Sequence, residues 1–212
     1  VLDRQIVQAD PNHAEAWHLL GTLDLQTGDY GAASQFVGRA LQLNPALAEA
    51  HNSLGNLYRG QGQLDAAIEC FQRAVALRPG SAELHYNLGN ALLAHERPAE
   101  AIESYRRALQ LDANFTAALN NLGYALKEQG QYAEAIACFE RALQLNPRST
   151  EASNNLGNAR REQGLANEAI EHYRQALKVD PDYLEALYNL GSALSAQGEL
   201  AEANACYERA AQ

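Results

Sequence analysis

Residues 48–81 read AEAHNSLGNLYRGQGQLDAAIECFQRAVALRPGS, and the same order of residue types returns every 34 residues along the chain. The aligned units are residues 14–47, 48–81, 82–115, 116–149, 150–183 and 184–212, and residues 1–13 match the tail of a preceding unit. A fixed period in this range indicates stacked structural units, because one unit cannot bury its apolar face alone. Residues 1–212 are therefore expected to form a single continuous array.

A few positions in each unit carry the packing. Position 7 is always Leu and position 8 always Gly, while Ala holds positions 20 and 27. From the second unit on, position 24 is aromatic: Phe71, Tyr105, Phe139, Tyr173 and Tyr207. In a helix, positions 4, 7, 8 and 11 lie on one side, and so do positions 20, 24 and 27. The pattern predicts two helices that approach closely at the small residues, with leucines and aromatic rings filling the space between them.

The turns are also marked. Position 15 is Gly in every unit but one, as suits a left-handed residue at the end of the first helix, and the exception is Glu96. Position 32 is Pro in most units, with Ala113 as an exception. Asn12 and Asp182, each with Glu three residues later, are expected to cap the helices that follow.

The stretches WHLLG at 17–21 and HNSLGNLY at 51–58, followed by Ala67, Phe71 and Pro79, resemble the tetratricopeptide repeat, TPR. The resemblance covers residues 14–212 and the tail in residues 1–13. It implies an all-α fold, a right-handed superhelical solenoid of antiparallel helix pairs called A and B. In such proteins the concave face, lined by A helices, usually holds a peptide or a partner segment.

Composition limits the partners. The net charge is −10 and only two lysines are present, which argues against nucleic acid as a partner. No run of 18 apolar residues exists, so no membrane association is expected. Cys70, Cys138 and Cys206 share position 23, two units apart, which is too far for a disulfide. Free thiols favour a reducing compartment, and we expect a cytoplasmic protein.

The sequence contains no pattern typical of catalysis. His51 and His85 share position 4, which Trp17, Leu119 and Leu187 hold elsewhere, so we interpret them as packing residues and not as metal ligands. Metalloprotease, P-loop, dinucleotide-binding and nucleophile-elbow motifs are all missing from the sequence. We therefore expect no catalytic residue, metal or cofactor, and no enzyme activity.

One face of helix A is rich in asparagine, which is a mediocre helix former and so needs a reason. Its amides could bond to one another between neighbouring helices, or to the backbone of an extended peptide, and both uses are compatible. Basic residues at position 12 and acidic residues at position 2 would give the groove edges of opposite charge. The candidate peptide-binding residues are Asn52, Asn56, Arg59, Tyr86, Asn87, Asn90, Asn120, Asn121, Tyr124, Lys127, Asn154, Asn155, Asn158, Arg161, Tyr188 and Asn189.

The leading hypothesis is a non-catalytic scaffold that binds an extended segment of a protein partner along this groove. The asparagine pattern is also similar to the TPR superhelix of O-linked N-acetylglucosamine transferases, where concave asparagines hold the polypeptide acceptor. That resemblance implies an alternative, the substrate-recognition arm of a larger enzyme with its catalytic domain beyond residue 212. A third hypothesis is a self-assembling spacer, associating end to end through uncapped terminal repeats.

Overall fold

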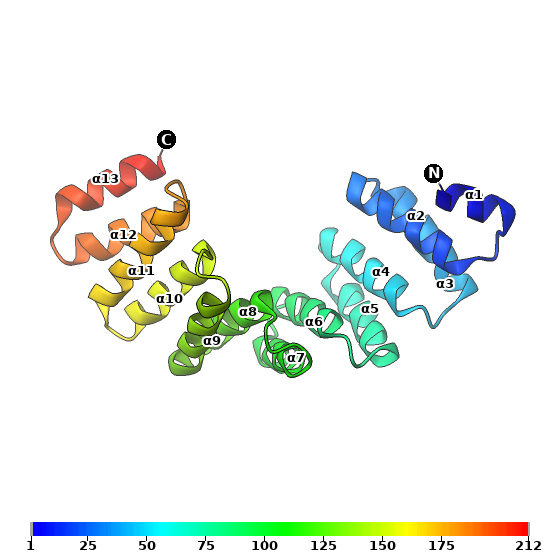
Figure 1. The fold of residues 1–212 in the computed structure, drawn as a ribbon, viewed down its shortest axis with the longest axis horizontal. Coiled ribbons are helices and arrows are strands. Elements are labelled where there is room, and N and C mark those ends of the chain that lie inside the picture. Colours follow the sequence, from blue (N-terminus) through cyan, green and yellow to red (C-terminus); the bar gives the residue numbers. More distant parts are fainter. Residues whose placement is uncertain (1, 212) are drawn as a thin grey trace. The chain divides into compact units, whose positions relative to one another are not determined.

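The computed structural model describes the backbone of residues 2–211 and the side chains of residues 6–211. Over this range the chain forms thirteen α-helices and no strand (Figure 1). The A helices are α2 (Ala14–Thr27), α4 (Ala48–Gly60), α6 (Ala82–Ala94), α8 (Thr116–Glu128), α10 (Thr150–Glu162) and α12 (Leu184–Ala196). The B helices are α1 (Leu2–Ala9), α3 (Tyr30–Leu43), α5 (Leu64–Leu77), α7 (Pro98–Leu111), α9 (Tyr132–Leu145), α11 (Ala166–Val179) and α13 (Leu200–Ala210).

The helices fall into two compact units, Val1–Asp112 and Ala113–Gln212. In both units, each A helix packs against the B helix that follows it, and A helices of successive repeats also touch. Unit 1 therefore brings α2, α4 and α6 together, and unit 2 does the same for α8, α10 and α12. The expected all-α fold of paired helices is confirmed. That the array runs unbroken over residues 1–212 stays a prediction.

Close approach of helix A to helix B explains the glycine at position 8. A Cβ atom added to Gly55 would lie 2.8 Å from the Phe71 ring, and one added to Gly123 would lie 2.6 Å from the Phe139 ring. Both rings are fully buried, so they have little room to move. The two facing stripes expected from the sequence are thus confirmed.

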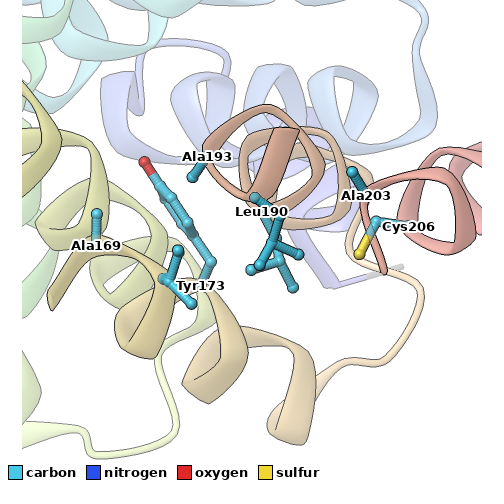
Figure 2. Close-up of a cluster of buried hydrophobic side chains, with 8 residues drawn as sticks. Ala169, Tyr173, Leu190, Ala193, Ala203 and Cys206 are labelled. Carbon is cyan, nitrogen blue, oxygen red and sulfur yellow. The ribbon is translucent and has the colours of Figure 1, made fainter. Parts of the chain in front are cut away.

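The same packing connects neighbouring repeats at the end of unit 2. Figure 2 shows a cluster in which Tyr173 of α11 and Leu190 of α12 lie between Ala169 on one side and Ala203 and Cys206 of α13 on the other. All five are buried, with at most 6% of their surface exposed. In this part of unit 2 one repeat therefore contributes to the core of the next, as expected for stacked units.

The turns between helices lie where the sequence predicts them, but the predicted helix caps need a correction. The five glycines at position 15 have φ between 73° and 85°, and Glu96 adopts φ 57° at the equivalent place. The expected caps, however, are wrong by one residue. His13, and not Asn12, is the N-cap of α2 and accepts from the Ala16 amide, while Tyr183 occupies the N-cap of α12. Asp182 instead lies within the preceding turn, where its amide donates to the Asp180 carboxylate at 3.1 Å.

Candidate functional site

Side-chain amides link neighbouring A helices in a regular series. Asn87 on α6 donates its Nδ2–H to Oδ1 of Asn52 on α4 at 3.0 Å. In unit 2, Asn155 donates to Asn120 at 3.2 Å and Asn189 donates to Asn154 at 2.9 Å. Each bond joins position 5 of one repeat to position 6 of the next, 35 residues later. We call these bonds rungs, and they confirm the first of the two uses considered for the asparagines.

Another rung of the same geometry was not predicted from the sequence, because its residue types differ. His18 on α2 forms a 2.9 Å hydrogen bond through Nε2 with Oγ of Ser53 on α4. Burial lowers the pKa of His18, although the nearby Glu49 acts in the opposite direction. The constant spacing of 35 residues between positions 5 and 6 was the signal that could have identified it.

In the rungs of unit 2 the position 6 asparagine is more exposed than its position 5 partner, whereas in unit 1 Asn87 is buried and Asn52 is half-buried. Asn120 and Asn154, at position 5, are only 5% and 4% exposed. Asn155 and Asn189, at position 6, are half-buried. A side-chain amide offers two N–H donors and an oxygen with two lone pairs, and a rung uses one N–H of the position 6 amide. In unit 2 the position 6 amides can thus bond further at the surface while the rung fixes their orientation.

Two asparagines at position 9, Asn90 and Asn158, bond to the interior of their own helix pair. The hydroxyl of Tyr105 donates to Oδ1 of Asn90 at 2.8 Å, and that of Tyr173 donates to Oδ1 of Asn158 at the same distance. Both tyrosine rings are fully buried. Asn56 faces a different partner and accepts from Arg59 at 3.2 Å. A hydroxyl that is buried needs such an acceptor, so these asparagines also stabilise the fold.

The position 12 cations contact groups close to them in sequence. Lys127 lies 2.6 Å from Oε1 of Glu128 and also 5.0 Å from the centre of the Tyr124 ring. Arg161 pairs with Glu162 at 3.4 Å. These contacts offset part of the positive charge on that edge. Two apolar rings remain accessible on the same face of unit 2, since Tyr124 is 41% exposed and Tyr188 is 65% exposed. Tyr86 in unit 1 is half-buried.

The ring nitrogens at position 4 bond to the preceding turn. Nε1 of Trp17 donates to the Pro11 carbonyl at 2.9 Å, and Nε2 of His85 bonds the Pro79 carbonyl at 3.0 Å. His51 bonds Pro45 in the same way. A carbonyl oxygen only accepts, so each histidine donates here. The histidines thus replace Trp17 as clamps on the turn between repeats. Within residues 6–211, no group of three or more His, Cys, Asp or Glu side chains is placed to hold a metal ion.

Three further features of the described residues concern a cavity, the cysteines and membrane crossing. Unit 1 has a cavity of about 530 Å³ beside α2 and α4, lined by His18, Leu19, Glu49 and Arg78. Two of these lining residues, Arg78 and Glu49, form an ion pair with each other. Cys70, Cys138 and Cys206 are not joined in disulfides. None of the helices described is both long enough and apolar enough to cross a bilayer.

Comparison with known families gives a consistent result. Five models of the tetratricopeptide repeat or TPR repeat match residues 14–47, 52–114, 116–149, 157–198 and 185–212. The chain is a tetratricopeptide repeat protein. Among curated proteins, a sequence search found no match.

Solved structures of TPR proteins resemble this one over most of their length. YrrB, described as a TPR protein with an unusual peptide-binding site, is 25% identical with a TM-score of 0.75, over 87% of this chain and 95% of that one. MamA is 27% identical with a TM-score of 0.72, over 80% and 92%. PilW, described as a widely conserved type IV pilus biogenesis factor, is 25% identical with a TM-score of 0.82, over 92% and 90%. These likenesses support a protein-interaction scaffold.

Proposed function

We propose that this TPR protein is a non-catalytic scaffold that binds an extended peptide segment along the A helices, and that asparagines at position 6 bond to the peptide backbone. The observation that carries the proposal is the rung. In unit 2, Asn155 and Asn189 are each fixed by a hydrogen bond to the previous A helix yet remain partly exposed. A donor and acceptor held in place in this way loses little conformational entropy on binding.

Neighbouring side chains would complete the site. Tyr124 and Tyr188 offer exposed rings for apolar side chains of the peptide. Glu151 and Glu185 lie at position 2, while Lys127 and Arg161 lie at position 12 near the other end of helix A. Because the two cations already contact Glu128 and Glu162, long-range charge steering would be weak. Amide bonds and aromatic contacts would therefore contribute more to affinity than the charged edges do.

The test starts from a peptide selected on the wild-type protein from a random library, with its affinity measured by fluorescence anisotropy. We expect the double substitution Asn155→Ala and Asn189→Ala to weaken binding about tenfold, since each neutral hydrogen bond contributes about 0.5–1.5 kcal/mol. Asn204→Ala is the matched control, because Asn204 is an exposed asparagine on helix B. It should leave the affinity unchanged.

Stability has to be measured alongside binding, because the rungs also join helices. Far-UV circular dichroism should show that the double variant is folded at the temperature of the binding assay. If the folded double variant binds the selected peptide as well as the wild-type protein does, the position 6 asparagines only join neighbouring helices and the proposal is wrong.

A further inference from the structure

A second concavity lies on the helix B side of unit 2, away from the asparagine rungs. It is a cavity of about 350 Å³ between α11 and α13, at the small end of the range for ligand pockets. Its apolar lining includes Leu177, Leu190 and Cys206. Leu190 and Cys206 belong to the buried cluster of Figure 2, so the floor of the cavity is the core of the last helix pair. Such a floor is rigid and suits one large apolar side chain.

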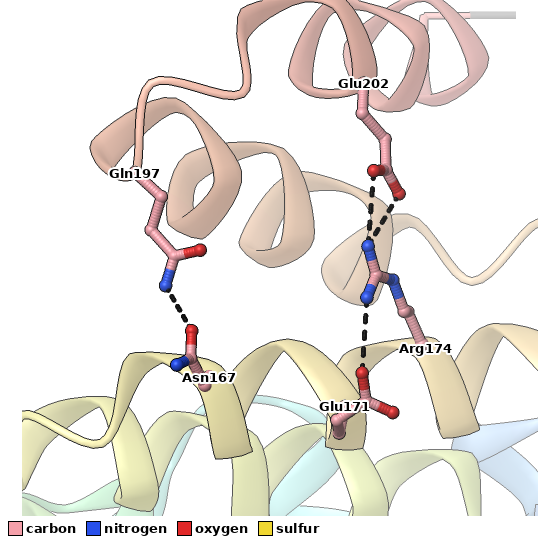
Figure 3. Close-up of polar contacts among 5 residues, drawn as sticks. All are labelled: Asn167, Glu171, Arg174, Gln197 and Glu202. Atoms are coloured by element: carbon pink, nitrogen blue, oxygen red, sulfur yellow. Dashed lines mark hydrogen bonds and ion pairs between the residues drawn. The ribbon is translucent and has the colours of Figure 1, made fainter.

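The rim of this cavity is positively charged. Arg174, Lys178 and Arg209 line it together with a single carboxylate, Glu202. Arg174 holds that carboxylate with two contacts of 3.0 and 3.2 Å and also reaches Glu171 at 3.2 Å (Figure 3). Arg209 donates to the Pro181 carbonyl, and Lys178 is exposed. Two lining cations, Lys178 and Arg209, are thus not used to neutralise Glu202, in a chain whose net charge is −10.

Ala205 is the smallest residue that lines the cavity. Ala205 occupies position 22 of its repeat, where Glu69, Glu103 and Glu171 stand in others. It is exposed and lines the cavity. Glutamate there would place a carboxylate and two more methylene groups at the opening. Alanine at this position therefore fills less space than glutamate and adds no negative charge to the rim.

We propose that this cavity is a second binding site, for an acidic peptide segment of a partner protein that carries one large apolar side chain. The apolar side chain would enter against Leu177, Leu190 and Cys206. Flanking carboxylates would pair with Lys178 and Arg209, since charge-assisted bonds to Lys and Arg are stronger than neutral ones. This site does not depend on the asparagine rungs, so either proposal can fail without the other.

The test uses a fluorescein-labelled heptapeptide, Glu-Glu-Gly-Phe-Gly-Glu-Glu, with anisotropy as the readout. Ala205→Glu should weaken binding at least about tenfold, and Lys178→Glu should weaken it about fivefold or more. The matched control is Ala137→Glu, because Ala137 is also exposed and also occupies position 22. That control should change the affinity less than about twofold.

Location is tested with the same peptide carrying benzoylphenylalanine in place of Phe. Its photo-crosslinks should map to residues 174–178 and 202–209 by mass spectrometry. Crosslinks on the A helices, equal affinity of the Ala205→Glu and wild-type proteins, or no saturable binding below about 1 mM would each overturn the proposal. Circular dichroism of the Ala205→Glu protein confirms folding, and the exposed Lys178→Glu variant keeps the test valid if that protein is not folded.

Discussion

Replacing Gly157 by alanine sets a favourable effect against an unfavourable one, and the structure decides which is larger. Within a helix, alanine is more favourable than glycine by about 1 kcal/mol. Against this, the new Cβ would lie 2.6 Å from Cε1 of Tyr173, 2.8 Å from Cδ1 and 3.1 Å from the Ala169 carbonyl oxygen. Distances below 3 Å force the ring to shift, and overpacking of a well-filled core costs about 1–3 kcal/mol.

The ring of Tyr173 cannot shift freely. It is fully buried, and its hydroxyl donates to Asn158 at 2.8 Å. A shift that breaks this bond leaves a buried hydroxyl without a partner, which costs a further 1–3 kcal/mol or so. We therefore expect Gly157→Ala to lower the free energy of unfolding by about 1–5 kcal/mol in net terms. Gly123→Ala meets Phe139 at the same 2.6 Å but breaks no hydroxyl bond, so its loss should be smaller by about 1–3 kcal/mol.

Urea denaturation followed by circular dichroism at fixed temperature measures the difference. Gly38→Ala is the control, because Gly38 lies inside α3 with no atom within 4 Å of an added Cβ. That variant should gain about 0.5–1 kcal/mol. A Gly157→Ala protein as stable as the wild type, beside a stabilised Gly38→Ala protein, would refute the argument that ring contact sets the glycine at position 8.

Three other predictions follow from the turns, the histidines and the thiols. Glu96→Gly should raise the free energy of unfolding by about 0.5–1 kcal/mol in urea denaturation, because Glu96 holds φ 57° where other repeats have glycine, whereas Glu96→Ala should give no such gain. Burial lowers the folded-state pKa of His18 and His172, so the stability they contribute is present above their unfolded pKa of about 6.5 and is lost as the pH falls through the folded values. The melting temperature should thus fall below about pH 6.5, and His172→Gln should reduce that slope; an unchanged slope would show that other groups control it. Burial raises the pKa of Cys70 to about 11. Near neutral pH, iodoacetamide should therefore alkylate Cys70 about a hundredfold more slowly in the folded protein than in the urea-unfolded chain. Equal rates for Cys70 in the two states would contradict the burial of this thiol.

Much of the fold could be predicted because the repeat period reflects contacts between helices that are neighbours in the sequence. Leu20, Gly55 and Phe71 behave as their positions indicated, since each helix pair closes within a few tens of residues and the same contacts recur. The caps were less predictable. His13 rather than Asn12 caps α2, because the cap depends on the exact φ and ψ of the turn, which residue type alone does not fix.

The sequence predicted that many asparagines share one face of helix A, but it did not predict what they bond to. The sequence placed the asparagines on one face of helix A, yet it left open whether they bond to one another or to a peptide. Contact between neighbouring A helices decides that Asn87 bonds to Asn52 and that Asn189 bonds to Asn154, 35 residues earlier in the sequence. The clamp from His85 to the Pro79 carbonyl has the same origin, since it requires the turn to fold back on the helix.

The sequence by itself determined the repeat, the helix pairs and the small residues between them, because these depend on the size of side chains at fixed helical positions. Only the tertiary structure decided which amides pair, which tyrosine hydroxyls are buried, and where a cavity opens beside Ala205. Hydrogen bonds act over about 3 Å and need a defined angle, so they are set by how one repeat stacks on the next. A pattern of residue types does not contain that geometry.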